Sequence, residues 1–278
     1  MGGRDIRTLG DAEARVLLTL ASQGKQVFTV ADAQEVVQGP RHRANKLLAH
    51  LSDKRWVLRL QRGLYLILPF EAGVEGTYSV HPFRIVPYLA TPYAIAYWTA
   101  LGHYGYTEQM PGTIYVSTTA ERASAKLTIE ALGLTYHFVI LAAHKFFGQR
   151  RIWIEGQEIM VTDPIKTVID CLDHPEYCGG IIEAAKGLYD GLTGGDVTPP
   201  SLTEVAGRMQ NRAIFKRLGY LAELLNLPVD AEIERWRDVL STGYSRLDLL
   251  AGDYGPYDSR WRLRLNRTPA DLTDWLVH

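Results

Sequence analysis

Cysteine is scarce in this chain, and long apolar runs are absent from it. Two of the 278 residues are cysteines, Cys171 and Cys178, which are too few for a disulfide framework and typical of reduced thiols. Because no run of about 18 apolar residues occurs, we expect no membrane-spanning helix. The first 13 residues lack the apolar core of a secretory signal. The sequence therefore predicts a cytoplasmic protein that makes no contact with a membrane.

Motifs of the common catalytic classes are also missing. The sequence has neither a phosphate-binding Walker loop nor the Gly-x-Ser-x-Gly turn of serine hydrolases. Glu183-Ala-Ala-Lys186 has the wrong spacing for the acidic metal site of a nuclease, and Gly194-Gly195-Asp196 has no second acid nearby, as a nucleotidyltransferase would need. None of the four histidines between residues 103 and 174 stands at a metal-ligand spacing from the cysteines. We expect no enzymatic activity, no cofactor and no metal.

Charge is distributed unevenly along the chain, although the net charge is only −1. Residues 1–70 contain 11 Lys and Arg against 6 Asp and Glu, a net charge of +5. The remaining residues contain 19 against 25, a net charge of −6. A basic first part on an acidic body indicates that nucleic acid binds to the first part.

The order of elements in residues 1–70 is that of a winged helix-turn-helix. A helix is expected over 11–23, with Asp11 as its cap, and Thr29-Val-Ala-Asp32 has the pattern of a capping box that opens a second, short helix. After Gly39-Pro40, the apolar spacing of Ala44, Leu47, Leu48 and Leu51 predicts a third helix. Strand-like segments at 56–60 and 64–68, joined by a turn that ends in Gly63, predict the hairpin.

Basic side chains follow the third helix and the hairpin. Between Arg41 and Arg62 the chain has seven Lys or Arg and one acid, Asp53. The residues expected to contact DNA are Arg41, His42, Arg43, Asn45, Lys46, His50, Lys54, Arg55, Arg59 and Arg62. Those in the first turns of the helix are placed to read bases in the major groove, and those from Lys54 onward to contact phosphates. The alternative is a winged helix that contacts protein, with these charges merely solvated.

The second part, residues 71–278, is predicted to be a larger mixed α/β domain, so that the chain is of the α+β class. A linker is expected at 71–77. Strands are expected at 113–118, 135–141, 151–154, 158–161 and 258–266, and helices at 92–104, 164–172, 179–190, 201–210, 213–226 and 230–240. Asp163 is favoured as the N-cap of the helix that starts at Pro164, and Asp170 as a polar contact at its packed end. A metal shared by these two aspartates is the alternative.

Two further groups of basic residues stand in the second part. The first group is Lys145, Arg150 and Arg151, and the second, Arg260, Arg262 and Arg264, alternates with Trp261, Leu263 and Leu265. Strict alternation puts the three arginines on one face of a strand and the apolar residues on the other. Both groups are interpreted first as ordinary solvated charge. The alternative is a second surface for DNA or for a partner.

Several motifs in order resemble those of the AbiEi family, the antitoxins of abortive-infection, type IV toxin–antitoxin systems. Arg62-Gly-Leu-Tyr-Leu66 is similar to the family's wing, and the segments 92–101 and 104–111 to the start of its antitoxin domain. Val161-Thr-Asp-Pro-Ile-Lys-Thr-Val-Ile-Asp-Cys-Leu172, followed by Gly179-Gly180, resembles its most recognisable motif. The segments 212–220 and 259–263 resemble its C-terminal part.

The resemblance implies an antitoxin that also represses its own operon. Its winged helix would bind inverted repeats of double-stranded operator DNA cooperatively, as two copies, and its second domain would counteract a nucleotidyltransferase-like toxin in phage defence. Two other functions stay open at this point. One is a winged-helix regulator whose second domain senses a ligand, and the other is a winged-helix-guided nuclease.

Overall fold

The computed structural model describes residues 8–73, 80–109, 111–121 and 125–277, and it divides the chain into two compact units. The first unit comprises residues 1–88 together with 128–134, and the second comprises 89–127 together with 135–278. The first unit thus extends beyond the expected residues 1–70. Of the expected linker at 71–77, residues 74–77 lie outside the described part. No described helix has both the length and the apolar character needed to cross a membrane.

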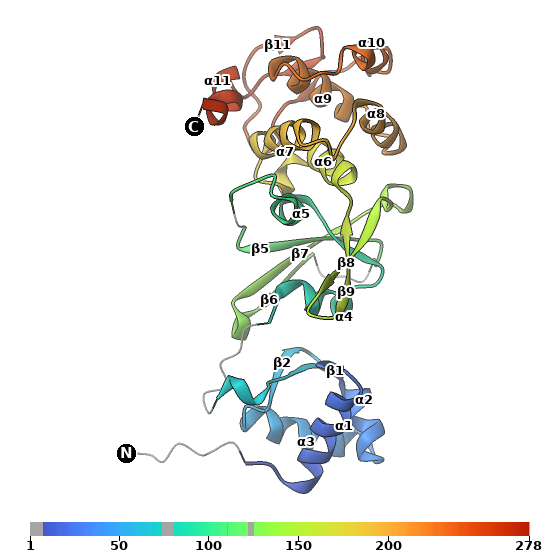
Figure 1. Cartoon of the computed structure of the whole chain (residues 1–278), viewed down its shortest axis with the longest axis vertical. Coiled ribbons are helices and arrows are strands. Elements are labelled where there is room, and N and C mark those ends of the chain that lie inside the picture. Colours follow the sequence, from blue (N-terminus) through green and yellow to red (C-terminus); the bar gives the residue numbers. More distant parts are fainter. Residues whose placement is uncertain (1–7, 74–79, 110, 122–124, 278) are drawn as a thin grey trace, which may run out of the picture. The chain divides into compact units, whose positions relative to one another are not determined.

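Three helices and a small sheet form the body of the first unit (Figure 1). In chain order the elements are α1 (Asp11–Ser22), β1 (Val27–Thr29), α2 (Val30–Val37), α3 (Arg41–Asp53), β2 (Val57–Gln61), β3 (Leu64–Ile67), η1 (Phe70–Ala72), η2 (Pro82–Ile85) and α4 (Val86–Leu89). The sheet is antiparallel with the order β1-β3-β2, and Gly63 makes its tight turn with a φ of 81°. This element order confirms the one predicted from sequence.

Local signals account for the helix boundaries of the first unit. Thr29 caps α2, and its backbone N–H donates in return to Asp32 at 2.7 Å, so the predicted capping box is confirmed. At α1 the predicted cap is wrong by one residue, because Gly10 occupies the N-cap position and its N–H donates to Glu13 at 2.8 Å. The apolar face predicted for α3 is confirmed, with Leu48 fully buried in the core of this unit.

The second unit combines a six-stranded mixed sheet with a layer of helices. Its sheet has the order β6-β7-β5-β4-β9-β8. The strands are β4 (Tyr93–Ile95), β5 (Thr113–Thr118), β6 (Lys126–Ile129), β7 (Leu134–Ile140), β8 (Gln149–Ile154) and β9 (Gln157–Thr162). The helices are α5 (Tyr97–Tyr104), α6 (Pro164–Asp173), α7 (Ile181–Thr193), α8 (Pro199–Arg208), α9 (Ala213–Leu224), α10 (Asp230–Asp238) and α11 (Pro269–Thr273). Its short 3-10 turns are η4 (Ala143–Lys145), η5 (Pro175–Tyr177) and η6 (Asp274–Val277), whereas η3 (Glu130–Leu132) falls within residues 128–134 of the first unit.

The main core of the second unit lies among its helices. Helix α6 contacts α5, α7, α8 and α9, and the predicted cap is confirmed, since Asp163 accepts the N–H of Lys166 at 2.7 Å. In Figure 1 the helices α6 to α10 lie on one side of the six-stranded sheet. A second small sheet follows α10 and precedes α11, with β10 (Ser245–Arg246), β12 (Leu263–Arg264) and β11 (Tyr257–Asp258) in that order.

Two predicted elements of the second unit are wrong. The helix expected to start at Pro92 starts at Tyr97 instead, because residues 93–95 form β4, which is buried and pairs with both β5 and β9. The continuous strand expected at 258–266 is interrupted by a turn, with Arg262 in the left-handed region at a φ of 54°. At residues 93–95, pairing with distant strands outweighs the helical pattern of the local sequence. At 258–266, the turn interrupts the strand and ends the alternation of side chains between its two faces.

A glycine in α9 gives a test of this packing. A Cβ added at Gly219 would lie 2.0 Å from Cζ3 of the buried Trp261, so we expect Gly219→Ala to destabilise the second unit by about 3 kcal/mol or more. Gly207 in α8 is the matched control, because a Cβ there meets nothing within 4 Å. Gly207→Ala should be neutral or stabilise by up to about 1 kcal/mol. Urea unfolding of both variants measures this, and equal stabilities would contradict it.

Candidate nucleic-acid interface

The exposed face of α3 carries most of the predicted contact residues. Burial of Ala44, Leu48 and Leu51 on one side of the helix turns the intervening positions outward. The residues that this leaves exposed are Arg41, His42, Arg43, Asn45, Lys46 and His50. The structure therefore gathers the six predicted helix residues on one accessible surface.

The basic side chains on this face of α3 are not paired with acids in the described part of the chain. Among the described residues, no Asp or Glu forms an ion pair with Arg41, Arg43 or Lys46. The first turn of α3 contains no acidic residue, and Pro40 leads into it in an extended conformation. Unpaired guanidinium and ammonium groups on an exposed helix face favour a polyanionic partner.

Lys54 has a structural partner. Its Nζ lies 2.7 Å from Oε2 of Glu13, a carboxylate on α1 that is only 7% exposed. Burial tends to raise the pKa of Glu13, but hydrogen bonds from the Gly10 N–H and from Lys54 outweigh it and lower this pKa overall. Lys54 thus fixes the end of α3 to the start of α1, and we expect it to contribute less to phosphate binding than the sequence indicated.

The turn after α3 and the hairpin place the remaining predicted contacts at the surface. Arg55 is exposed and has a left-handed backbone at a φ of 58°. Arg59 on β2 is exposed, and its Nε makes a long hydrogen bond of 3.4 Å to the carbonyl of Gln61. Arg62 is exposed at the tip of the hairpin. These three guanidinium groups extend the basic set from the helix to the hairpin.

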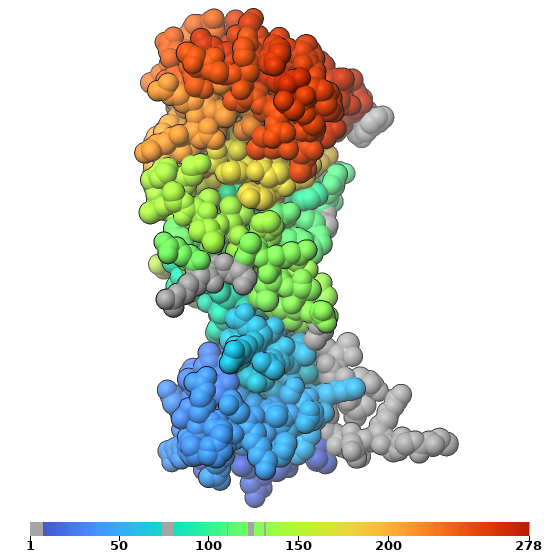
Figure 2. Space-filling model, turned by 180° about the vertical axis from the view of Figure 1, so that it is seen from behind, coloured from blue at the N-terminus to red at the C-terminus, as the bar shows by residue number. Residues whose placement is uncertain are grey.

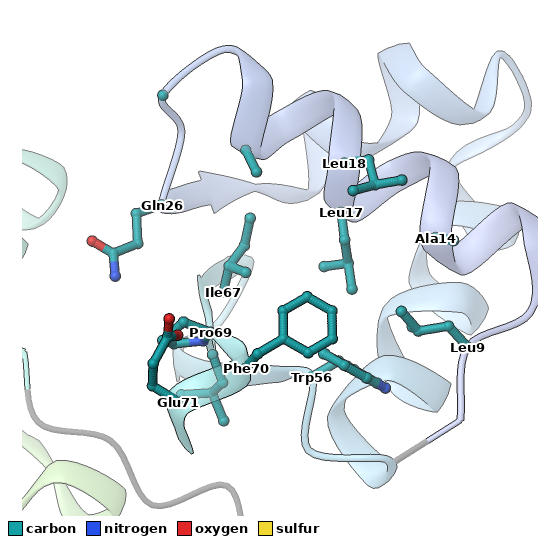
Figure 3. Close-up of a pocket in the computed structure, with 13 residues that line it drawn as sticks. Leu9, Ala14, Leu17, Leu18, Gln26, Trp56, Ile67, Pro69, Phe70 and Glu71 are labelled. Carbon is teal, nitrogen blue, oxygen red and sulfur yellow. The ribbon is translucent and has the colours of Figure 1, made fainter. Parts of the chain in front are cut away.

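An apolar groove of about 460 Å³ is a separate feature of the first unit (Figure 3). Helix α1 contributes Leu17 and Leu18 to it, and Trp56 and Phe70 face them from the other side. The rings of Trp56 and Phe70 meet edge to face at 5.1 Å, while Leu18 and Phe70 stay largely exposed. The groove shares no residue with the predicted DNA contacts, so the basic surface does not depend on what occupies it.

The six basic residues suggested as a second surface do not form one free patch. All of them belong to the second unit, and each is engaged by a neighbouring group. The interactions are Lys145 with Asp173 at 2.7 Å, Arg150 over the Tyr104 ring at 5.4 Å, Arg151 with Glu158 at 3.3 Å, Arg260 with Glu223 at 2.6 Å, Arg262 with the Ser241 carbonyl at 3.0 Å, and Arg264 with Asp253 at 2.8 Å. Of the second group, Arg260 and Arg262 therefore stabilise the local fold.

A buried charge network around α6 was only partly visible in the sequence. Lys166 and Asp170 form an ion pair one turn apart, and both side chains are at most 1% exposed. Burial raises the pKa of Asp170, and the Lys166 ammonium opposes that shift. Asp173, also buried, accepts hydrogen bonds from Lys145 at 2.7 Å and Asn211 at 2.5 Å. In the sequence, this network could have been recognised from a Lys and an Asp four residues apart within a helix whose other residues are mostly apolar.

The network shows no arrangement suited to a metal. Among the described residues, no group of three or more His, Cys, Asp or Glu side chains is placed to hold a metal ion. Asp163 is occupied as the N-cap of α6, and Asp170 is paired with Lys166, so the aspartates do not share a ligand site.

The ion pair inside α6 can be tested by removing one charge or both. We expect Asp170→Ala to destabilise the second unit by roughly 3–5 kcal/mol, because it leaves the Lys166 ammonium buried and unpaired. The double variant Lys166→Met/Asp170→Leu removes both charges and should recover most of that loss. Arg151→Ala, which breaks the exposed pair with Glu158, is the control and should cost less than about 0.5 kcal/mol. Chemical unfolding that ranks the double variant below Asp170→Ala would contradict this.

The pair of Glu13 with Lys54 predicts a pH dependence. Since the folded protein lowers the pKa of Glu13, the stabilisation is present above the carboxyl's unfolded pKa and is lost as pH falls through the folded value. Glu13→Gln should therefore lower the stability of the first unit at neutral pH by up to about 1 kcal/mol. The difference from wild type should vanish as pH falls below about 4. Thermal unfolding across this range measures both, and a difference that grows toward acid would contradict the assignment.

Comparison with known proteins identifies a shared fold. No protein-family model matches the chain, and no curated protein matches it. A solved structure, that of the RV2827C protein from Mycobacterium tuberculosis, is similar with a TM-score of 0.69 and 15% sequence identity. The similarity covers 99% of this chain and 98% of that one. At 15% identity, this similarity establishes the fold alone. The predicted α+β class agrees with the mixed fold that is observed.

Proposed function

We propose that the first unit is a winged helix-turn-helix that binds double-stranded DNA in a sequence-specific manner. The observation that carries the proposal is the exposed face of α3, where Arg41, Arg43 and Lys46 have no acidic partner among the described residues. The order α1, β1, α2, α3, β2, β3 supports it, since in winged helices the third helix enters the major groove and the hairpin follows it.

The side chains divide into two roles. Arg41, Arg43, Asn45 and Lys46 occupy the first two turns of α3, where guanidinium groups read guanine and an amide reads adenine. Arg55, Arg59 and Arg62 contact phosphates and fix the register of the protein on the duplex, and His42 and His50 are exposed on α3 as further contacts. Lys54 holds α1 and α3 together through Glu13.

We further propose that the chain is a cytoplasmic antitoxin that represses its own operon. The support is the order of motifs that resemble the AbiEi family, from the hairpin to the segment at 259–263. Two copies would bind inverted repeats of the operator, and the second unit would counteract a nucleotidyltransferase-like toxin. In this function the second unit has no catalytic activity and requires no cofactor.

Operator binding is tested by mobility shift on the DNA upstream of the gene, at two salt concentrations and against scrambled DNA. Wild type should bind its own DNA in two steps, and the binding should weaken with salt. Arg43→Ala combined with Lys46→Ala should weaken this binding by about a hundredfold or more. The control, Arg151→Ala, removes an exposed arginine of the second unit and should bind as wild type.

The outcomes separate the two proposals. Binding no tighter to upstream than to scrambled DNA would reject the repressor and assign the basic face to protein contacts. Antitoxin activity is measured separately, by co-expression with the cognate nucleotidyltransferase-like toxin. Rescue of growth by the Arg43→Ala/Lys46→Ala variant would show that neutralisation does not need DNA binding, and failure of wild type to rescue would reject the antitoxin function.

A further inference from the structure

The small C-terminal sheet aligns two arginines and a tyrosine across its three strands. In register, Arg246 of β10 lies beside Arg264 of β12, and Arg264 lies beside Tyr257 of β11. The adjacent position on β12, Leu263, is fully buried, so the Arg264 face is the outer one. In Figures 1 and 2 this segment, orange to red, lies at the end of the second unit away from its six-stranded sheet.

Three tyrosines of this C-terminal segment are exposed. Tyr244, Tyr254 and Tyr257 have exposed fractions of 49%, 55% and 60%, although buried tyrosine is common elsewhere in the unit. The rings of Tyr244 and Tyr257 meet edge to face at 4.8 Å, and the guanidinium carbon of Arg264 lies 5.3 Å from the Tyr257 ring centre. The contact between the two rings and the cation fixes Tyr257 in place while leaving more than half of it accessible.

The sequence of this segment is basic, against the trend of the rest of the second part, although Arg260, Arg264 and Arg267 are each paired with an acid. Residues 239–267 contain five Arg and three Asp, a net charge of +2, whereas residues 71–278 as a whole carry −6. Arg246 and Arg264 are cross-strand neighbours of like charge, an arrangement that costs free energy without an anion between them. Asp253 pairs with Arg264 at 2.8 Å, but the Asp253 side chain is 68% exposed. The Nε atom of Arg264 is buried and has no hydrogen-bond partner among the described residues.

We propose that this surface, Arg246, Arg264, Tyr257 and Tyr244, binds single-stranded nucleic acid. The two guanidinium groups bind backbone phosphates, and an unpaired base stacks on the accessible face of Tyr257. Stacking on Tyr257 favours a single strand over a duplex, whose bases are already stacked on one another, and exposed aromatic rings beside arginines on a sheet are a common platform for single strands. The inference goes beyond operator binding, because it involves neither α3 nor the hairpin.

The test uses the full chain with Arg43→Ala and Lys46→Ala, so that operator binding by the first unit is strongly weakened and the remaining first-unit arginines are the same in every protein compared. Fluorescence anisotropy is measured with a labelled oligouridylate, the corresponding oligodeoxyuridylate and a duplex DNA. In this background, Tyr257→Ala should weaken single-strand binding by about tenfold, while Tyr257→Phe, which keeps the ring, should bind normally. Arg246→Ala should weaken binding and reduce its salt dependence. Arg151→Ala, an exposed arginine of β8, is the matched control and should have no effect.

Single-strand binding that exceeds duplex binding and follows this order of variants supports the proposal, and a difference between the two oligonucleotides assigns it to RNA or DNA. Absence of binding, or equal binding by the Tyr257→Ala and unsubstituted proteins, overturns it. Binding of an acidic protein that is lost in Tyr257→Ala, with no binding of the oligonucleotides, also overturns it and assigns the surface to protein recognition. The outcome does not depend on operator binding, because every protein compared carries the Arg43→Ala and Lys46→Ala substitutions that weaken operator binding.

Discussion

One buried guanidinium joins three parts of the second unit, namely α9, the end of α6 and the small C-terminal sheet. Arg217 on α9 is 2% exposed, and it donates to the carbonyls of Leu172 at 2.8 Å, Leu247 at 3.0 Å and Arg246 at 3.0 Å. These carbonyls belong to the end of α6 and to the strand β10 and the residue after it. Burial lowers the pKa of Arg217, while Asp173, Glu176 and Asp248 nearby favour its charged form. Because a buried cation must have its donors satisfied, this side chain, together with Lys216 and Glu223 of the same helix, positions the small C-terminal sheet against the helices.

The first unit uses cations in the opposite way. Its helix α3 buries only apolar side chains, and its guanidinium and ammonium groups remain in water without acidic partners among the described residues. Lys54 is the exception, and it bridges to Glu13 as a structural tie. The same residue types therefore stabilise the fold in the second unit and present charge in the first. Burial and pairing distinguish the two roles.

The sequence predicted the structure correctly where the signal was local. The capping box at Thr29, the cap at Asp163 and the apolar face of α3 each depend on residues a few positions apart, and each is confirmed. It failed where distant segments decide. Tyr93 to Ile95 follow a proline and have helix-compatible composition, yet they pair with strands on both sides and are buried. The alternation at 258–266 placed Arg260, Arg262 and Arg264 together, but the turn at 259–262 separates them.

The sequence by itself determined the order of elements in the first unit and the basic character of its third helix. Both follow from periodicity and composition, which act over one or two turns of chain. Only the tertiary structure decided which cations are free, because pairing of Lys54 with Glu13 or of Lys145 with Asp173 joins residues far apart in sequence. It also decided that Arg246, Arg264 and Tyr257 form one row. Their register depends on backbone pairing between three short strands that Arg217 holds in place, and no pattern along the chain encodes it.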